Sequence, residues 1–369
     1  MRSGSWVIKL VAAGLLGALV TGAGGCGRSG EGTKRIVLLT NGNSPFWDAC
    51  RVGLQAASKD LKLEEQGLRA VFDVNDGTPG GQLQKLRQFA SQGDVAAVAV
   101  SAVDATNQAV ADEMRNLMRK GVKVICVDGD LGEKFRDART FYIGTDNRMG
   151  GRVLGTAARE LLKARGVKKG SYAQFVGRLG SQNAQDRMGG FEEAVGKQYR
   201  QADRMQDGFD RTKARDNVRN AITNHADLVA LVGIWSYNAP AIVDVIKEQK
   251  NNRQRFTIVT FDAEPIAIDQ MGEKYIDAMV VQDPYDMGYQ AVRLLTAMVR
   301  GDKEGIAKMF PRQGQDGGDL YVTSLKVISP DEGSPLAAEA FASEFGDRVN
   351  FMTLSEFKSW LEKYKLKGS

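Results

Sequence analysis

The chain has 369 residues, 43% of them hydrophobic, and its 50 basic and 45 acidic side chains give a formal net charge of +5. This length is enough for two domains with substantial cores. The basic residues form no long run or clustered face, so no nucleic acid is expected as a partner. With three cysteines and one histidine, the sequence excludes a disulfide framework and indicates neither a metal nor a cofactor.

The first 25 residues have the pattern of a lipoprotein signal peptide. Arg2 and Lys9 form a basic region, an apolar run of 11 residues follows at 10–20, and small residues precede Cys26. The apolar run is shorter than the roughly 20 residues of a membrane-spanning helix. The stretch AGGC, residues 23–26, resembles a bacterial lipobox and predicts lipidation of Cys26, with an ordinary signal peptide or a retained anchor as alternatives. Residues 26–33 are expected to be a flexible tether.

The first predicted strand, residues 36–39, leads into a helix that begins with a pair of aromatic side chains. Ser44 fits as the N-cap, Pro45 as the first helical residue, and Phe46 and Trp47 lie in the first turn. In open parallel α/β sheets, ligands bind outside the carboxyl ends of the strands. The aromatic pair therefore lies where a ligand, rather than water, is expected to cover it.

Further apolar, β-branched runs along the chain predict buried strands, separated by segments with the helical period. All the predicted strands are Ile36–Leu39, Ala70–Val74, Val95–Val100, Val122–Val127, Thr140–Ile143, Ser171–Val176, Leu228–Ile234, Phe256–Phe261 and Ala278–Val281. This alternation predicts an α/β fold with parallel sheets covered on both faces, and the number of strands suits two lobes. Residues 330–369 leave the alternation and end in a mixed helix around Phe357 and Trp360.

Cys50, Cys126 and His225 are given structural rather than catalytic roles. Both cysteines lie in apolar stretches and are expected to be buried free thiols, with one cross-link between them as the alternative. His225 lies between a helical segment and a strand, and no serine stands in the context of a nucleophile elbow, so a catalytic triad is not indicated. A literal G-x-G-x-x-G at residues 22–27 has no strand before it and no helix after it, so it does not indicate a nucleotide site.

Two aspartates, Asp128 and Asp262, each end a strongly apolar predicted strand. As carboxylates they can accept hydrogen bonds from neighbouring sugar hydroxyls. The alternatives are capping of the next helix or glycosidic acid–base chemistry. Gln282 ends a third strand and offers both a donor and an acceptor. We interpret the three side chains as ligand-binding groups at the carboxyl ends of strands.

Aromatic side chains at other strand ends fit the same kind of site. The aromatics in βα loops or first helical turns are Phe46, Trp47, Phe209, Trp235 and Tyr237. A sugar ring has apolar faces and a polar rim, so flat rings and carboxylates together form a suitable lining. Each aromatic alone is better explained by core packing, but five at such positions favour a binding site.

From about Lys34 to Ile328 the chain resembles the periplasmic sugar-binding proteins of the ribose/galactose type, receptors of ABC importers that are related to LacI effector domains. The carrying stretches are VLLTNGNSPFWDACRVG, VKVICVDGD, YIGTDNRMGG, NAQDRMGGF, GFDRTKARDN, VTFDAEP and VVQDPYDMG. The resemblance implies two Rossmann-like doubly wound lobes joined by a three-strand hinge. It divides the chain into an N-terminal lobe (34–144 and 283–318), a C-terminal lobe (145–282 and 319–330) and a C-terminal extension (331–369).

The resemblance also implies roles for individual residues. Phe46 and Trp47 would cover one face of a sugar ring and Phe209 the other, while Asp128, Asp262 and Gln282 would bind hydroxyls. The full expected ligand-binding set is Thr40, Ser44, Phe46, Trp47, Asp128, Thr145, Gln185, Arg187, Phe209, Trp235, Asp262 and Gln282.

Several positions depart from the ribose receptors. Gly129 and Gln185 stand where those receptors have arginines, although Arg187 follows two residues later, and Ser44 and Trp235 replace asparagines. These changes put ribose itself in doubt, while a pentose, a hexose or a polyol remains an expected ligand.

The expected function is that of a substrate-binding lipoprotein of an ABC-type sugar importer, which binds a monosaccharide between two lobes by hinge closure. Its expected partners are the sugar, the importer's permease and a membrane reached through a lipid anchor, and the protein is expected to be a monomer. It is expected in the periplasm or on the outer surface of the cell envelope. The alternatives are an extracytoplasmic sensor for a chemoreceptor or histidine kinase, and a glycosidase, for which the sequence offers no acid with an evidently raised pKa.

Overall fold

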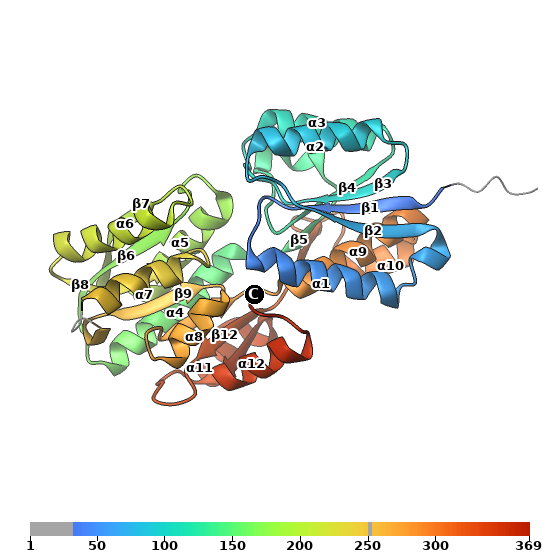
Figure 1. The fold of residues 1–369 in the computed structure, drawn as a ribbon. Helices are drawn as coiled ribbons and strands as arrows, with labels where there is room; N and C mark the ends of the chain where they lie inside the picture. The colour runs from blue at the N-terminus through green and yellow to red at the C-terminus, as the bar shows by residue number, and fades with distance from the viewer. Residues whose placement is uncertain (1–31, 250–252) are drawn as a thin grey trace, which may run out of the picture. The chain divides into compact units, whose positions relative to one another are not determined.

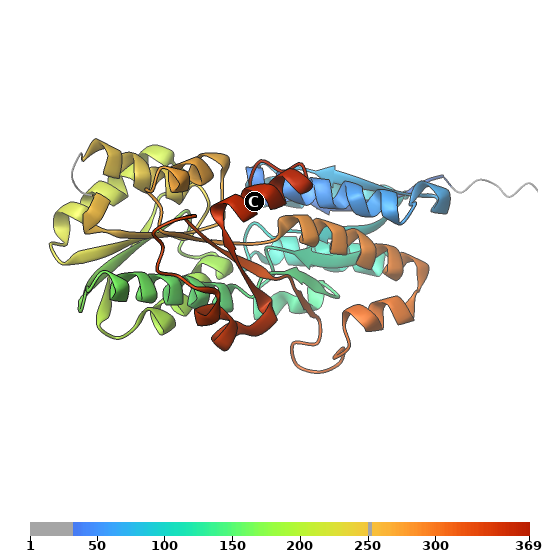
Figure 2. The same ribbon diagram turned by 90° about the horizontal axis from the view of Figure 1, so that it is seen from below.

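The computed structural model describes residues 32–249 and 253–369, which form two β-sheets with helices on both faces of each (Figures 1 and 2). The signal-peptide and Cys26 predictions lie outside these residues. Neither described segment contains a helix both long enough and apolar enough to span a bilayer.

The first sheet has six strands in the order β11-β5-β4-β3-β1-β2, and every neighbouring pair is parallel. Its strands are β1 (Lys34–Leu39), β2 (Leu68–Asp73), β3 (Val95–Val100), β4 (Lys123–Val127), β5 (Tyr142–Gly144) and β11 (Leu320–Val322). One face packs against α1 (Pro45–Asp60), α9 (Pro284–Arg300) and α10 (Lys303–Met309), and the other against α2 (Pro79–Ser91) and α3 (Gln108–Arg119). We call this sheet with its helices the first lobe.

The second sheet has seven strands in the order β13-β12-β10-β9-β8-β6-β7, all parallel except the β10–β12 pair. Its strands are β6 (Gly170–Val176), β7 (Tyr199–Gln206), β8 (Leu228–Gly233), β9 (Thr257–Phe261), β10 (Ala278–Val281), β12 (Leu325–Ser329) and β13 (Val349–Thr353). One face packs against α4 (Asn147–Ala164), α5 (Gln182–Val195) and α11 (Ala338–Phe345), the other against α6 (Arg211–Asn224), α7 (Asn238–Glu248), α8 (Pro265–Gly272) and α12 (Leu354–Lys363). This is the second lobe.

Burial on both faces explains why the strands are nearly continuous apolar runs. In β1, Ile36 and Leu38 pack under α1 and α9, while Val37 and Leu39 pack under α2 and α3. Successive side chains of a strand point to opposite faces, so a strand covered on both sides needs apolar residues throughout. Short 3-10 helices complete the described elements: η1 (Glu64–Gln66), η2 (Glu133–Ala138), η3 (Arg253–Arg255) and η4 (Gly346–Arg348).

In each lobe one pair of helices packs with the backbones in direct contact. Between α1 and α9, a Cβ atom added at Gly53 would lie 1.9 Å from the carbonyl oxygen of Tyr285. Between α4 and α5, a Cβ atom added at Gly151 would lie 2.1 Å from the carbonyl oxygen of Arg187. No side chain fits at either glycine, so these two helix pairs are fixed at their shortest separation.

The chain passes between the lobes three times. The crossovers are residues 145–146 between β5 and α4, residues 282–283 between β10 and α9, and residues 323–324 between β11 and β12. They lie next to one another, because the Thr145 hydroxyl donates to Gln282 Oε1 at 2.8 Å and the Thr323 amide donates to the Gly144 carbonyl at 2.8 Å.

All nine strands that the apolar runs predict are present, and α1 begins at Pro45 as expected. The structure adds β7, β11, β12 and β13. Residues 320–322, expected in the C-terminal lobe, form β11 of the first sheet. The extension contributes β13 to the second sheet and α12 to its core.

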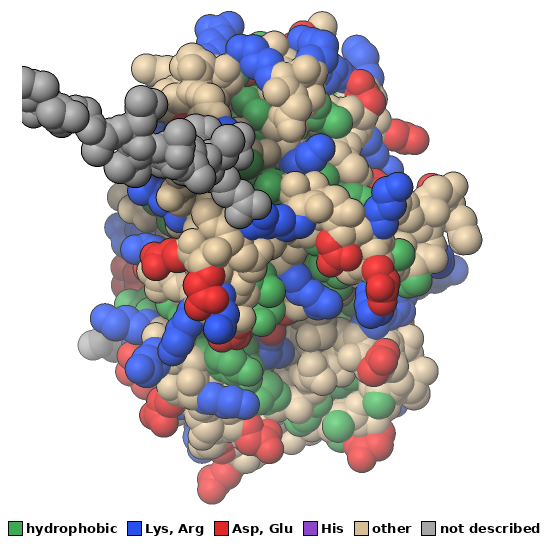
Figure 3. Space-filling model, turned by 90° about the vertical axis from the view of Figure 1, so that its right-hand side faces the viewer, with side chains coloured by type: hydrophobic (Ala, Val, Ile, Leu, Met, Phe, Trp, Pro, Cys, Tyr) green, Lys and Arg blue, Asp and Glu red, His purple; other side chains and the backbone are tan. Residues whose placement is uncertain are grey.

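The cysteines and the histidine have the structural roles expected of them. Cys50 and Cys126 are free and buried, and burial raises the pKa of both thiols, which makes them unreactive. His225 follows the last residue of α6, and its Nε2 pairs with Asp203. On the face drawn in Figure 3, acidic and basic side chains are interspersed, without a broad basic patch.

Candidate functional site

A cavity of about 980 Å³ lies at the carboxyl ends of strands from both lobes. This volume is at the upper end of the range of small-molecule sites. Ten of the twelve expected ligand-binding residues line it: Ser44, Phe46, Trp47, Asp128, Thr145, Arg187, Phe209, Trp235, Asp262 and Gln282. Reading the strand ends thus locates a single site.

Thr40 and Gln185 do not line the cavity, so the structure does not support the expectation that they bind ligand. The Thr40 hydroxyl is used inside its own turn, where it donates to the Gly42 carbonyl and accepts from the Asn75 amide. Gln185 is exposed on α5, and its side chain donates to the Leu179 carbonyl. Two residues further along the helix, Arg187 points inward and is buried.

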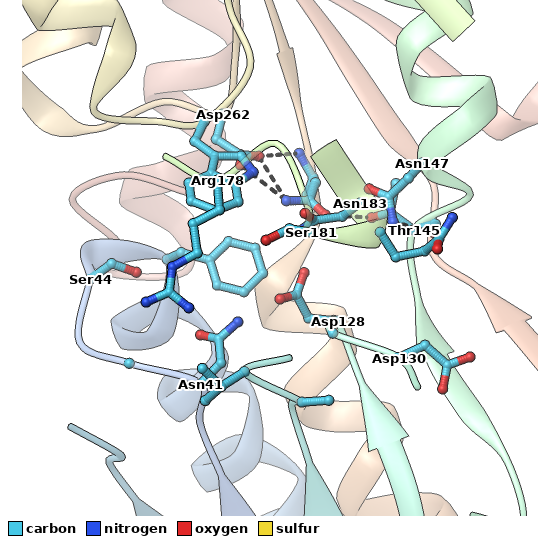
Figure 4. Close-up of a pocket in the computed structure, with 18 of the residues that line it drawn as sticks. Asn41, Ser44, Asp128, Asp130, Thr145, Asn147, Arg178, Ser181, Asn183 and Asp262 are labelled. Atoms are coloured by element: carbon cyan, nitrogen blue, oxygen red, sulfur yellow. Dashed lines mark hydrogen bonds between the residues drawn. The ribbon is translucent and has the colours of Figure 1, made fainter. Parts of the chain in front are cut away.

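Asp128 and Asp262 have the same unusual backbone. Each follows a strand, β4 or β9, and each has a left-handed conformation, with φ of 59° and 62°. Aspartate tolerates this region better than most residues do. Neither caps the following helix, because η2, which follows Asp128, begins after Gly132, and α8, which follows Asp262, begins after Glu264. The turned backbone aims both side chains at the cavity (Figure 4).

Asp262 is held by the glutamine of the second crossover. The Gln282 side-chain amide donates to both carboxylate oxygens, at 3.1 and 3.0 Å, and its backbone amide donates to Oδ1 at 3.3 Å. Thr145, from the first crossover, donates to Gln282 Oε1 at 2.8 Å. The carboxylate is therefore fixed by hydrogen bonds that reach both crossovers.

Arg187 is the buried cation of the site, with only 2% of its surface exposed. Its Nη1 lies 3.7 Å from Asp262 Oδ2 and donates to the Ile234 carbonyl at 3.2 Å, and its Nε donates to Asn147 Oδ1 at 2.9 Å. The guanidinium also lies 3.8 Å from the centre of the Phe261 ring. Burial lowers the pKa of Arg187, and the charges of Asp262 and Asp128 oppose this shift.

Asp128 has far less support than Asp262. Burial raises the pKa of its carboxyl group to about 7, although the Arg187 charge and the Ser101 hydroxyl act in the opposite direction, and the Asp262 charge adds to the rise. Burial raises the pKa of Asp262 as well, against the Arg187 charge and the bonds from Gln282. One buried cation thus serves two buried carboxylates, and Asp128 is the one left poorly compensated.

The aromatic side chains enter the cavity from both lobes. Phe46 and Trp47, in the first turn of α1, meet edge to face with ring centres 5.0 Å apart, and Trp47 Nε1 donates to Asn41 Oδ1 at 3.0 Å. The Ser44 side chain makes no capping bond to α1, so its hydroxyl is available to the cavity. Phe209, in the second lobe, is 54% exposed and lies 5.2 Å from the Trp235 ring.

A buried aspartate holds the Phe209 loop in place. Asp207 accepts hydrogen bonds from the Phe209 amide at 2.8 Å, from Asn238 Nδ2 at 3.0 Å and from the Tyr237 hydroxyl. Phe209 has a φ of 69°, a conformation that is strained for a bulky residue. The exposed ring is therefore maintained by the surrounding structure rather than by local preference.

Sequence reasoning missed the arginines of the cavity other than Arg187. Arg136, Arg148, Arg178 and Arg211 also line it. Arg178 directly follows Gly177 at the end of β6, so reading the strand ends reaches it but assigns it no binding role. Its guanidinium lies 5.1 Å from the Phe209 ring centre and reaches into the cavity in Figure 4. Arg136 lies within the 3-10 helix η2, whereas Arg148 and Arg211 lie in the first turns of α4 and α6, positions like those of Phe46 and Trp47 in α1.

Comparisons with known proteins agree with this architecture. A family profile described as a periplasmic binding protein domain matches residues 35–303. The ribose import binding protein RbsB of Bacillus subtilis (strain 168) is 20% identical over 261 residues, which cover 71% of this chain and 80% of the relative.

Two solved structures share the fold. An ABC transporter solute-binding protein from Burkholderia graminis, in complex with D-arabinose, has a TM-score of 0.68 at 22% identity, covering 81% of this chain and 96% of that chain. GanP, a glucose-galactose binding protein from Geobacillus stearothermophilus, has a TM-score of 0.66 at 25% identity, covering 81% of this chain and 98% of that chain.

Proposed function

The chain belongs to the family of periplasmic binding protein domains, and from this premise we propose that it is the substrate-binding lipoprotein of an ABC-type sugar importer. The expected two-lobed α/β fold and the expected family are both confirmed. The family consists of substrate-binding proteins rather than enzymes, and it implies a location outside the cytoplasmic membrane.

One observation carries the proposal: carboxylates and aromatic rings from two lobes converge on one cavity. Asp128 extends from the first lobe, while Asp262 and Gln282 lie at strand ends of the second. A monosaccharide offers hydroxyl donors around its rim and C–H groups on its faces, which match such a lining. The names of the relatives, which refer to ribose, D-arabinose and glucose-galactose, support the same ligand class.

The three adjacent crossovers support binding by hinge closure. A ligand that contacts Asp128 on one side and Asp262 on the other makes its full set of contacts only when the lobes are closed. It therefore stabilises the closed state by the difference between its binding free energies for the closed and open states. For the lobes we propose the division given by the resemblance, with residues 320–322 assigned to the first lobe.

The proposal extends to a lipid anchor on Cys26, with the importer's permease as partner and the protein acting as a monomer. Mass spectrometry of the protein extracted from cell envelopes tests the anchor, because a diacylglycerol adduct on Cys26 supports it and an unmodified mature chain contradicts it.

A thermal-shift screen tests the ligand class. The panel is D-ribose, D-arabinose, D-xylose, D-glucose, D-galactose and D-allose, with L-glucose as the stereochemical control. A sugar that binds only the folded protein stabilises it by about 2.7 kcal/mol at a concentration of 100 times its Kd, so its melting temperature rises. We expect at least one D-sugar to raise the melting temperature and to give a saturable heat in calorimetry. No response to any of them would refute the monosaccharide assignment.

We expect Phe209→Ala to weaken binding of the responding sugar about 10-fold, which corresponds to the loss of roughly 1.4 kcal/mol of ring contact. Stability should change little, because the Phe209 ring is largely exposed. Ile266→Ala is the matched control, since Ile266 is 49% exposed and does not line the cavity. Calorimetric titration measures the sugar affinity of both variants. If Phe209→Ala binds the sugar as tightly as Ile266→Ala does, the Phe209 ring does not cover the ligand.

A further inference from the structure

The segment after α12, residues 364–369, returns to the strand ends that carry the ligand-binding groups. Ser369 is 2% exposed. Its backbone amide donates to the Ala263 carbonyl at 3.0 Å, and the Ala263 amide donates to the Ser369 carbonyl at 2.8 Å. This reciprocal pair joins the segment to the residue directly after Asp262.

The Ser369 side chain makes a second connection. Its hydroxyl donates to the backbone carbonyl of Gln282 at 2.9 Å, at a buried position. Gln282 is the residue whose amide groups hold the Asp262 carboxylate. One serine therefore bonds to the loops that end β9 and β10, which present the two ligand-binding side chains.

The close approach depends on a glycine. A Cβ atom added at Gly368 would lie 2.5 Å from the Ala263 carbonyl oxygen and 3.1 Å from Pro265 Cδ. Because backbone rather than a flexible side chain lies in the way, any larger residue there would displace the segment from the β9 loop.

The other end of the segment reaches the first lobe. The Tyr364 ring lies 4.6 Å from that of Tyr285, in the first turn of α9, and 5.2 Å from that of Trp360. Lys326, on β12, lies 4.1 Å from the Trp360 ring centre and 2.6 Å from Asp283 Oδ2 in the second crossover. Figures 1 and 2 draw this end of the chain, marked C, near the middle of the described structure.

We propose that residues 364–369, which we call the clip, position Asp262 and Gln282 for the ligand and so help to set its affinity. The clip acts through these residues, because none of its own residues lines the cavity. The effect on affinity rests on the proposed function, whereas the effect on the two loops does not.

Hydrogen exchange without ligand tests the clip directly. In Gly368→Val and Ser369→Ala, we expect the amides of Ala263 and Gln282 to exchange about 10-fold faster or more, since losing one hydrogen bond changes a local opening constant by this order. The cores of β9 and β10 should stay protected. Gly93→Val is the matched control, because a Cβ atom at Gly93 meets nothing within 4 Å. Unchanged exchange in both clip variants would overturn the proposal.

Affinity for the panel sugar with the largest thermal shift gives the second test. We expect Ser369→Ala to raise Kd about 5-fold, as the loss of one hydrogen bond allows. In a Gln282→Ala background the same change should leave Kd unaltered while still lowering stability, because the side chain that it positions is gone. An equal Kd effect in both backgrounds, or none in either, would contradict positioning through Gln282. If no panel sugar binds, the exchange test still decides on the clip.

Discussion

Replacing Asp128 with asparagine is expected to stabilise the unliganded protein above pH 7 while severely weakening sugar binding. Burial places the pKa of Asp128 near 7, against an ordinary value of 3.8. The folded protein therefore holds this proton more tightly than the unfolded chain does, and wild-type stability falls as the pH rises from about 4 to about 7. Asparagine has nearly the same shape, also tolerates a positive φ and carries no charge, so the variant avoids this loss.

The size of the Asp128→Asn effect follows from the pKa difference. At 1.36 kcal/mol for each pKa unit, the variant should gain roughly 4 kcal/mol at pH 8, with the gain growing between about pH 4 and pH 7 and constant above. Losing a charged acceptor should raise the sugar Kd by about 10-fold to 100-fold. Urea unfolding at pH 5 and pH 8, together with calorimetry, measures both effects.

Asp269→Asn is the control for the Asp128 variant, because Asp269 is exposed on α8 and outside the cavity. Asp269→Asn should change neither the free energy of unfolding nor the Kd for the sugar. An Asp128→Asn protein that binds sugar like the wild type would remove Asp128 from the site. One that is less stable at pH 8 would show that its buried charge is well compensated.

Arg187→Met is expected to cause the largest loss of stability, about 3–5 kcal/mol at pH 8. Methionine fills much of the volume but leaves the buried Asp262 and Asp128 without their shared cation. Without this charge the pKa of both carboxyl groups rises further, so both are more fully protonated at pH 5 than at pH 8, and the loss of stability should be smaller at pH 5. The lost hydrogen bonds to Ile234 and Asn147 lower stability at both pH values. The difference between the stability loss at pH 8 and that at pH 5 therefore measures the contribution of the Arg187 charge.

Urea unfolding at the two pH values tests Arg187→Met, with Arg219→Met as control. Arg219 also pairs with two acids, Asp216 and Glu248, but at the surface. Replacing it should therefore lower the free energy of unfolding much less than Arg187→Met does. Adding Asp262→Asn to Arg187→Met should recover part of the stability at pH 8. Losses of equal size at pH 5 and pH 8 would mean that Arg187 contributes packing rather than charge compensation.

Apolar runs predict most of the strands that are buried on both faces, although the fully buried β12 was missed. The missed strand β7 is an edge strand, YRQADRMQ, whose residues are mostly half-buried and polar. The missed strand β11 has only three residues and is an edge strand of the first sheet. Both strands form because they pair with a neighbouring strand, and their own residues show no apolar pattern that predicts this pairing.

The site was most predictable where side chains directly follow a strand or open the next helix, as Asp128, Asp262, Phe46 and Trp47 do, although Thr40 also follows a strand and does not line the cavity. Asp128, Asp262 and Gln282 were found because each directly follows the carboxyl end of a strand, where open parallel α/β sheets bind ligands. The sequence does not show which side of α5 faces the cavity. Gln185 and Arg187 are two residues apart on this helix, so their side chains point about 200° apart and only one of them can face the cavity. The paired charges around Arg187 join parts of the chain that are distant in sequence, so no local pattern announces them.

The two glycine contacts between helices have a mechanical consequence. Helix α9 starts at the second crossover and touches α1, which carries Phe46 and Trp47, at Gly53. Helix α4 starts at the first crossover and touches α5, which carries Arg187, at Gly151. The first and second crossovers are thus each linked, through a direct backbone contact between two helices, to a helix that carries ligand-facing side chains. Backbone rotation at either crossover is therefore expected to move that helix together with the one that follows the crossover.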